Sequence, residues 1–224
     1  MDIDDFQKRV LFFTKRERGG WFTPEKISDL MHMAQMWLFV QELDVYAQTR
    51  IVQKSLSPFV VQTPFVTGAD GVIQLPVGET DNPRFADFCS AYAMYQDTGK
   101  ARYREIKFFE ENSIAERLDS QTLEPSVNDP VGEIIGKGKV QLYPQANISG
   151  NVRWIKNPVK PVYAYTRSGA DKRTITYDKA GSTQLEWLET DINKILVRTV
   201  QLAGVNIDDK TLLQYSEAKI QNKI

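Results

Sequence analysis

A long helical pattern that stops at a proline constrains this chain more than any other feature. From Pro24 onward, small or apolar residues recur at near-heptad spacing to about residue 54. The pattern predicts one helix roughly 45 Å long, with Thr23 as its N-cap. We expect Ser57-Pro58 to close it, because the residue before a proline is pushed out of the α region. A helix this long usually crosses a large domain or lines an assembly.

Shorter amphipathic helices are predicted towards both ends of the chain. The first is about 15 residues long and ends at Gly19-Gly20, a C-cap signal. Near the other end, residues 187–204 have the same periodicity, and residues 208–222 predict a last helix that opens with two aspartates. We expect the helices from the two ends to pack together.

The residues between these helices predict a β block. Apolar runs at 59–66 and 71–76 flank Gly68-Ala69-Asp70-Gly71 and indicate a hairpin, and Pro64 indicates an edge strand or a bulge. Residues 85–96 and 102–109 indicate a second hairpin, although the alanine-rich first run also fits a helix.

Further along the β block, Ser113 fits the N-cap of a short helix, with Glu116 completing a capping box. Short strand-like runs separated by turn residues follow at 131–136, 139–144, 150–158, 161–166 and 174–178.

These elements predict an α+β fold in which a helical body carries an inserted, mainly antiparallel β domain. We place the N-terminal helices in residues 1–57, the inserted domain with its short helix in 58–182, and the C-terminal helices in 183–224.

Composition excludes several classes of protein. The 28 Lys and Arg residues nearly balance the 29 Asp and Glu residues in the 224-residue chain, which argues against a generally basic nucleic-acid binder. No apolar run is long enough for a membrane span, and we expect no secretion signal. Cys89 is the only cysteine, which excludes an internal disulfide and favours folding in a reducing cytoplasm.

No cluster of residues in the sequence indicates catalysis. His32 lies between two methionines with no second histidine or cysteine nearby, and Cys89 lies among apolar residues. The run at 132–140 departs from the spacing of a phosphate-binding loop and is better explained by a hairpin turn. We expect no enzyme activity, no catalytic residue, no cofactor and no metal.

Several residues are candidates for contacts with partners. Some cations end the first helix or lie at a predicted turn and could face DNA phosphates, although solvated helix ends and turns are the plainer explanation. They are Lys15, Arg16, Arg18, Lys137 and Lys139. The aromatic pair at the glycine hinge fits either a hydrophobic staple or an interface anchor. Our interface candidates are Trp21, Phe22, Trp37, Leu213 and Ile220.

Six stretches, in order, carry a resemblance to ring proteins of crAss-like bacteriophages. They are the long helix with its Leu-x-Pro-Phe exit, "GADGVIQLP", "FFEENSIAERLDS", "DPVGEIIGKGKVQLYPQ", "NPVKPVYAYT" and the helix within "LEWLETDINKILVRTVQLAGVNI". Together they span about residues 28–222. The chain departs from the family pattern after Leu75-Pro76, where an Asp-Tyr pair is replaced by "VGETDNPRF".

The resemblance implies a virion structural protein similar to the head-to-tail adaptors of short-tailed phages. Such a protein forms a homo-oligomeric ring, of twelve copies by resemblance, below the portal. It contacts the portal and neighbouring tail or ring proteins, leaves a channel for transient, non-specific passage of double-stranded DNA, and needs no membrane. It would be assembled in the cytoplasm of the bacterial host. Leu213 and Ile220 would anchor a C-terminal segment on a neighbouring ring, so deletion of residues 205–224 should abolish portal binding.

Two alternatives stay open. A tail-hub or tail-tube ring of the same virion would have a similar layout, and only the position of the ring in the particle distinguishes it from a connector ring. An unrecognised soluble enzyme would need a pocket with convergent polar groups around Cys89, His32 or Glu110.

Overall fold

The computed structural model describes residues 1–18, 22–49, 51, 54–75, 85–97, 100–109, 111–120, 122–135, 138–168 and 174–204. It confirms the predicted α+β fold, with helices from both ends of the chain and a central region of mainly antiparallel sheet. The chain divides into two compact units, a helical unit of residues 1–58 with 158–224 and a β unit of residues 59–157. Our expected inserted domain began within one residue of this division but extended to residue 182.

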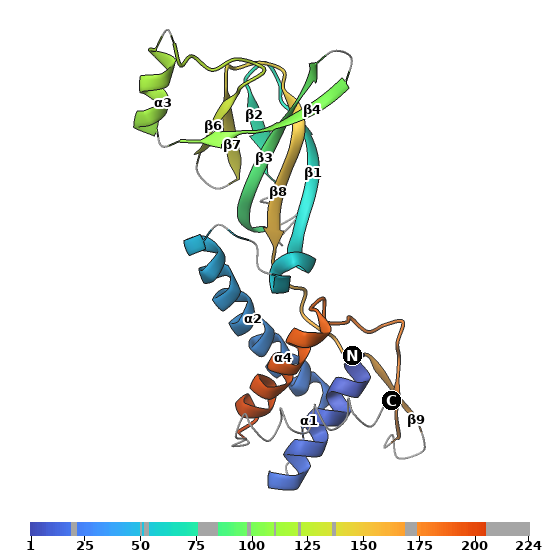
Figure 1. The fold of residues 1–224 in the computed structure, drawn as a ribbon. Helices are drawn as coiled ribbons and strands as arrows, with labels where there is room; N and C mark the ends of the chain where they lie inside the picture. The colour runs from blue at the N-terminus through green and yellow to red at the C-terminus, as the bar shows by residue number, and fades with distance from the viewer. Residues whose placement is uncertain are drawn as a thin grey trace. The chain divides into compact units, whose positions relative to one another are not determined.

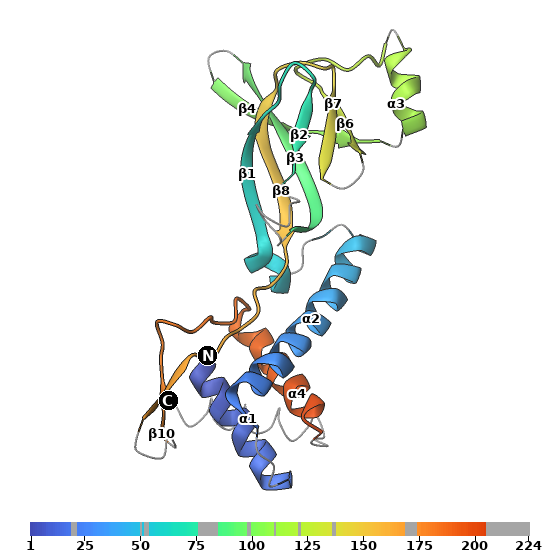
Figure 2. The same cartoon turned by 180° about the vertical axis from the view of Figure 1, so that it is seen from behind.

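The helical unit is built from three helices, α1 (Ile3–Arg18), α2 (Pro24–Thr49) and α4 (Glu189–Leu202). The buried faces of α2 and α4 pack on each other, and α1 also contacts α4 (Figures 1 and 2). The buried side chains follow the predicted helical periodicity: Ile3, Phe6 and Val10 from α1, Ile27, Met31, Ala34 and Leu38 from α2, and Ile192, Ile195 and Leu196 from α4. Gly204 follows α4 with φ +81°, as its C-cap position predicts.

The start of α2 is as predicted, but its end is not. Lys26 N donates to Thr23 Oγ1 across 3.4 Å, which confirms the cap. The helix stops at Thr49 rather than near residue 54. Thr49 Oγ1 donates to the Val45 carbonyl across 2.8 Å and accepts from Ile51 N across 3.2 Å, so this side chain competes with the backbone bonds that continue a helix. Pro58 lies instead in a separate 3₁₀ helix, η1 (Lys54–Phe59).

A small hairpin completes the helical unit. Strands β9 (Tyr165–Ser168) and β10 (Thr174–Tyr177) pair antiparallel. Gln35 Nε2 donates to the Val159 carbonyl across 2.8 Å and thereby ties α2 to the segment that leads into this hairpin. Residues 208–222, our predicted last helix, lie outside the described residues.

Two four-stranded sheets form the β unit. One has the order β1-β8-β3-β4 and contains β1 (Val60–Val66), β8 (Ser149–Lys156), β3 (Phe85–Asp97) and β4 (Lys100–Glu105). The other has the order β2-β7-β6-β5 and contains β2 (Val72–Gln74), β7 (Lys139–Tyr143), β6 (Val131–Ile135) and β5 (Lys107–Phe108). The first sheet is antiparallel throughout, while β5 and β6 of the second are parallel.

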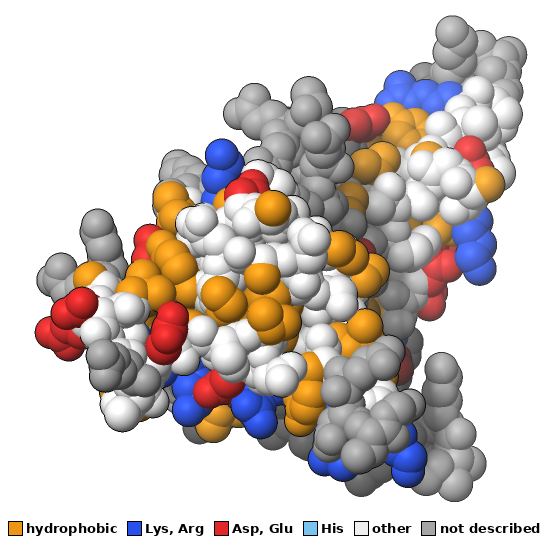
Figure 3. All heavy atoms as spheres, turned by 90° about the horizontal axis from the view of Figure 1, so that it is seen from above, with side chains coloured by type: hydrophobic (Ala, Val, Ile, Leu, Met, Phe, Trp, Pro, Cys, Tyr) orange, Lys and Arg blue, Asp and Glu red, His pale blue; other side chains and the backbone are white. Residues whose placement is uncertain are grey.

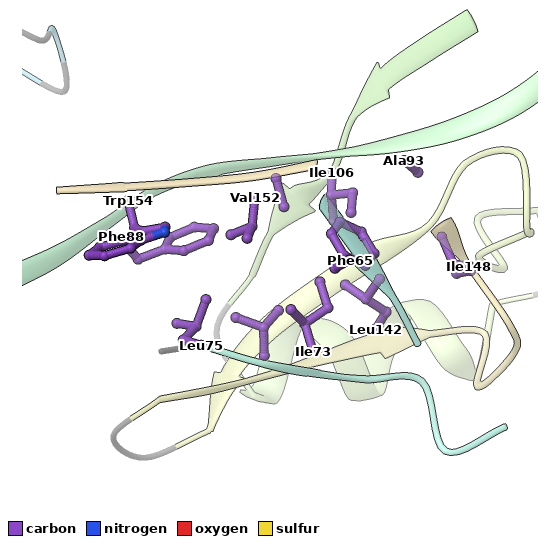
Figure 4. Packing of buried hydrophobic residues seen from close by; sticks show 12 residues of the cluster. Phe65, Ile73, Leu75, Phe88, Ala93, Ile106, Leu142, Ile148, Val152 and Trp154 are labelled. Atoms are coloured by element: carbon purple, nitrogen blue, oxygen red, sulfur yellow. The ribbon is translucent and has the colours of Figure 1, made fainter. Parts of the chain in front are cut away.

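The core of the β unit lies between these two sheets. In Figure 4, Trp154, Phe88 and Val152 point from one sheet towards Leu75, Ile73 and Leu142 of the other. The remaining members of this buried cluster are Phe65, Ala91, Ala93, Ile106, Val140 and Ile148.

Our first predicted hairpin, at Gly68–Gly71, is wrong. The turn forms, with Gly71 at φ +68° and Gly71 N bonded to the Gly68 carbonyl, but β1 pairs with β8 and β2 pairs with β7. Thr67 explains the separation, because its hydroxyl bonds the backbone beside β8 while Gly71 O accepts from Leu142 N in the second sheet. The turn therefore carries the chain from one sheet to the other.

Several other predictions for the β block are confirmed, but the run at 161–166 is a strand only from Tyr165, and it belongs with the run at 174–178 to the helical unit. β3 and β4 form the second hairpin, which settles residues 85–96 as a strand, and β6 and β7 form the hairpin at 132–140. Pro64 lies in β1, an edge strand, as predicted. Helix α3 (Glu111–Leu118) begins two residues before Ser113, so Ser113 is not its N-cap. No helix in the described ranges has the length and apolarity that crossing a membrane requires.

Candidate interaction surfaces

Helix α2 has apolar residues on two opposite faces. One face is buried in the helical unit, whereas the other carries the α2 stripe, which we define as Leu30, Met33, Trp37 and Val40. Met33, Trp37 and Val40 keep 56%, 40% and 49% of their surface exposed. A helix that is apolar all round is usually buried on all sides, so the α2 stripe indicates a surface that a partner covers.

Arg198 of α4 supports one side of the α2 stripe. Its guanidinium carbon lies 4.9 Å from the centre of the Trp37 ring, and its Nη1 donates to Gln201 Oε1 across 3.3 Å. A cation over an aromatic face is attractive, and it fixes the ring orientation. Trp37 therefore presents a preset aromatic surface rather than a freely rotating one.

A second uncovered surface lies on the outer face of the first sheet. Val66 of β1, Ser149 of β8, Met94 of β3 and Tyr103 of β4 form one row across all four strands, and we call them the outer sheet row. In the adjacent row, Phe65 and Ala93 point to the core, so alternation places the outer sheet row on the opposite face.

The outer sheet row is apolar at three of its four positions. Val66 is 78% exposed and Tyr103 is 56% exposed, and Met94 is also exposed. Seen from above in Figure 3, the described surface of the molecule as a whole mixes hydrophobic side chains with charged ones of both signs. Beside the row, Arg153 lies over the Tyr92 ring at 5.3 Å and donates to Gln62 Oε1 across 3.1 Å, which adds a polar margin. An apolar strip with a polar margin is the usual anatomy of a protein interface.

The edge strand β4 presents cations that sequence reasoning missed. All six of its residues are exposed, and Lys100, Arg102 and Arg104 occupy alternate positions, which places them on one side of the strand. Arg104 pairs with Asp129 across 3.3 Å and lies 5.4 Å from the centre of the Tyr95 ring. The alternation of basic residues in "KARYRE" could have indicated this row of cations from the sequence. Charges on an edge strand also prevent unwanted strand pairing.

The structure describes only part of the predicted contact set. Phe22 is half-buried before α2, Trp37 belongs to the α2 stripe, and Lys139 is exposed at the start of β7. Lys15, Arg16 and Arg18 belong to α1, but their side chains are outside the described set. Trp21, Lys137, Leu213 and Ile220 also lie outside the described residues, so their roles stay predictions.

His32 and Cys89 lie in different units. Half-buried His32 on α2 has its Nδ1 3.0 Å from Gln35 Nε2, and burial, followed by the positive charge of Lys160, lowers its pKa. Half-buried Cys89 belongs to β3, and Glu110 lies outside the described residues. Among the described side chains, no group of three His, Cys, Asp or Glu residues is arranged to hold a metal ion.

Three tyrosines bond carboxylates at the starts of α1 and α2. Tyr163 Oη donates to Asp4 across 3.1 Å, Tyr177 Oη to Asp2 across 3.0 Å, and Tyr165 Oη to Glu25 across 2.5 Å. Burial first, and then Asp4, raises the pKa of Tyr163 to about 12. This arrangement anchors the β9–β10 hairpin and the segment before it to the starts of α1 and α2.

No family model matches the chain, and no curated protein matches it.

Proposed function

We propose that this protein is a virion structural protein that forms an oligomeric ring in the head-to-tail connector of a tailed bacteriophage, below the portal. The resemblance to crAss-like ring proteins gives the class of particle and the expectation of twelve copies. The protein would act by fitting against identical neighbours and against the rings above and below it, with DNA passing through the channel.

The observation that carries this proposal is that, among the described residues, each compact unit has an uncovered apolar surface. The α2 stripe lies on the helical unit and the outer sheet row lies on the β unit. A single folded chain gains nothing by exposing either. A subunit in a stacked ring must contact neighbours through more than one patch, because a ring closes through two different surfaces of each copy.

The charges of the β unit support a channel that touches DNA without holding it. Lys100 and Lys139 are exposed cations that can meet phosphates, while Asp129 offsets Arg104. A near-neutral chain also limits the strong, salt-dependent grip that a basic groove would exert. Transient, non-specific contact is what a DNA conduit requires.

The test is assembly with the portal protein of the same phage. The full-length chain, mixed with that portal, is examined by mass photometry and negative-stain electron microscopy, and we expect ring-shaped complexes. In the double variant Val66→Lys/Met94→Lys, two lysines replace apolar members of the outer sheet row, and ring formation should fall at least tenfold. Ile175→Lys, at an exposed position of β10, is the matched control and should assemble normally.

Two results would count against the proposal. A wild-type chain that never joins the portal would remove the connector assignment. Normal rings from the double lysine variant would show that the outer sheet row is not the contact between subunits.

A further inference from the structure

The exposed face of α2 extends beyond the α2 stripe to a charged residue at each end. Taken at 100° per residue, its six positions fall within an arc of about 80° of the helix. In order along the helix they are Lys26, Leu30, Met33, Trp37, Val40 and Asp44. All are exposed except half-buried Leu30.

This face has a symmetric arrangement about position 35. Met33 and Trp37 are each two residues from that position, Leu30 and Val40 are each five, and Lys26 and Asp44 are each nine. Each apolar residue therefore has an apolar counterpart at the mirrored position, and the one cation has the one anion as its counterpart.

We propose that two copies of this chain pair through α2, antiparallel, about a two-fold axis at position 35. Met33 of each copy then faces Trp37 of the other, Leu30 faces Val40, and Lys26 faces Asp44. An interface of this kind is isologous, because both copies contribute the same patch. It buries both α2 stripes at once and places opposite charges together at each end.

The charges select the antiparallel arrangement. A parallel pair in register would place Lys26 opposite Lys26 and Asp44 opposite Asp44, which is repulsive at both ends. Within the described part of the chain, Lys26 and Asp44 form no salt bridge, so both are available to a partner. Arg198 already fixes the Trp37 ring from one side, which lowers the cost of ordering it at the contact.

The two-fold contact differs in kind from the ring contact. An isologous surface is saturated by one partner and cannot propagate, so it does not close a ring. The dimer is therefore the form of the free chain before assembly, in which the α2 stripe is covered until a connector partner replaces the second copy. The pairing of two copies does not depend on the proposed function; only its replacement by a connector partner rests on it.

Sedimentation velocity of the full-length chain tests the dimer. The wild type should be a dimer at micromolar concentration. Lys26→Asp and Asp44→Lys should each weaken dimerisation about tenfold, because each places two like-charge pairs in the interface. The double variant Lys26→Asp/Asp44→Lys restores opposite charges and should return the affinity to within about threefold of wild type. A monomeric wild type, or a double variant as weak as the single ones, would overturn the inference.

Disulfide trapping tests the register. In a Cys89→Ser background, a Leu30→Cys chain is mixed with a Val40→Cys chain under mild oxidation. A heterodimeric disulfide should form at least tenfold faster in this mixture than in either chain alone. Val45→Cys, exposed on α2 but off this face, is the matched control partner and should give no such acceleration. Equal trapping at positions 40 and 45 would contradict the antiparallel register.

Failure here is distinguishable from failure of the ring proposal. A chain that stays monomeric yet forms rings with the portal would refute the dimer and leave the connector function intact. A chain that dimerises as described but never joins the portal would refute the connector function and leave the dimer intact.

Discussion

The phenol of Tyr165 donates its hydrogen bond to Glu25 across 2.5 Å and thereby joins β9 to the first turn of α2. Arg167 Nη2 donates to the same phenol oxygen across 3.0 Å. Tyr177 makes the equivalent bond to Asp2 ahead of α1, and Gln184 Nε2 donates to Tyr177 Oη across 2.9 Å. The β9–β10 hairpin therefore holds both helix starts through ionised carboxylates, which makes the helical unit sensitive to acid.

Acid should weaken the helical unit. The hydrogen bond from Tyr165 lowers the pKa of Glu25. Burial alone would raise the pKa of Asp2, but hydrogen bonds from Tyr177, the Asp4 backbone and Gln184 together lower it. A carboxyl whose folded pKa is depressed stabilises the fold above its unfolded pKa, and that contribution is lost as the pH falls through the folded value. Thermal unfolding followed at 222 nm should therefore shift to lower temperature below about pH 4.

The matched variants for this prediction are Tyr165→Phe and Tyr177→Phe. Tyr177→Phe should lower the stability at neutral pH by about 1 kcal/mol, and Tyr165→Phe by less, because its bond to Glu25 is exposed to solvent. Both should reduce the loss on acidification, because a carboxylate loses the bond that favoured its charged form. Tyr103→Phe, in the β unit, should leave the acid dependence unchanged. Identical acid profiles for all three variants would show that these bonds do not set it.

Strong alkali should also weaken the helical unit, through Tyr163. Its raised pKa, about 12, means that the folded state favours the protonated phenol. The associated stability is present below the ordinary pKa near 10 and is lost as the pH rises towards the folded value. Absorbance at 295 nm should show a late titrating component, to which Tyr163 contributes together with Tyr177, whose pKa burial also raises. Tyr163→Phe should remove the part of that component that titrates near pH 12. A titration with no late component in the wild type would contradict the prediction.

Sequence periodicity predicted the helices and most strand runs, because both patterns are local. It did not predict strand partners: the Gly68–Gly71 turn looks like a hairpin locally, but the hydroxyl of Thr67 bonds backbone near residue 148 and separates β1 from β2. The predicted end of α2 was wrong for a similar reason. The apolar spacing continues beyond Thr49, but the hydrogen bonds of the Thr49 side chain compete with those that would continue the helix.

The candidate surfaces were predictable only in part. Trp37 was identified as an interface candidate, but the outer sheet row joins Val66, Ser149, Met94 and Tyr103 through a register that no local pattern contains. Burial likewise decides which of the two apolar faces of α2 stays uncovered, and that depends on where α4 packs.

Gly150 should be intolerant of any side chain. A Cβ at this position would overlap the carbonyl oxygen of Tyr92 on the neighbouring strand and press on the Phe65 ring. Gly150→Ala should therefore force β8 and β3 apart and cost about 3 kcal/mol. Gly68→Ala is the control, since its Cβ would meet only the movable Asp70 side chain. Urea unfolding of both variants measures the difference, and equal midpoints would contradict the packing described.

Replacing Thr67 by valine should destabilise the junction between the two sheets without changing side-chain shape. The buried hydroxyl donates to the Ala146 carbonyl across 2.7 Å and accepts from Ile148 N across 2.7 Å. Valine keeps the volume but leaves that buried N–H without its partner, at a cost of about 1–3 kcal/mol. Hydrogen exchange followed by mass spectrometry should show faster exchange over residues 146–150 in Thr67→Val. Thr176→Val, at an exposed position of β10, should leave exchange there unchanged. Valine conserves the shape of the side chain. Unchanged exchange in Thr67→Val would therefore mean that packing, and not this hydroxyl, stabilises the segment that leads from β1 to the second sheet.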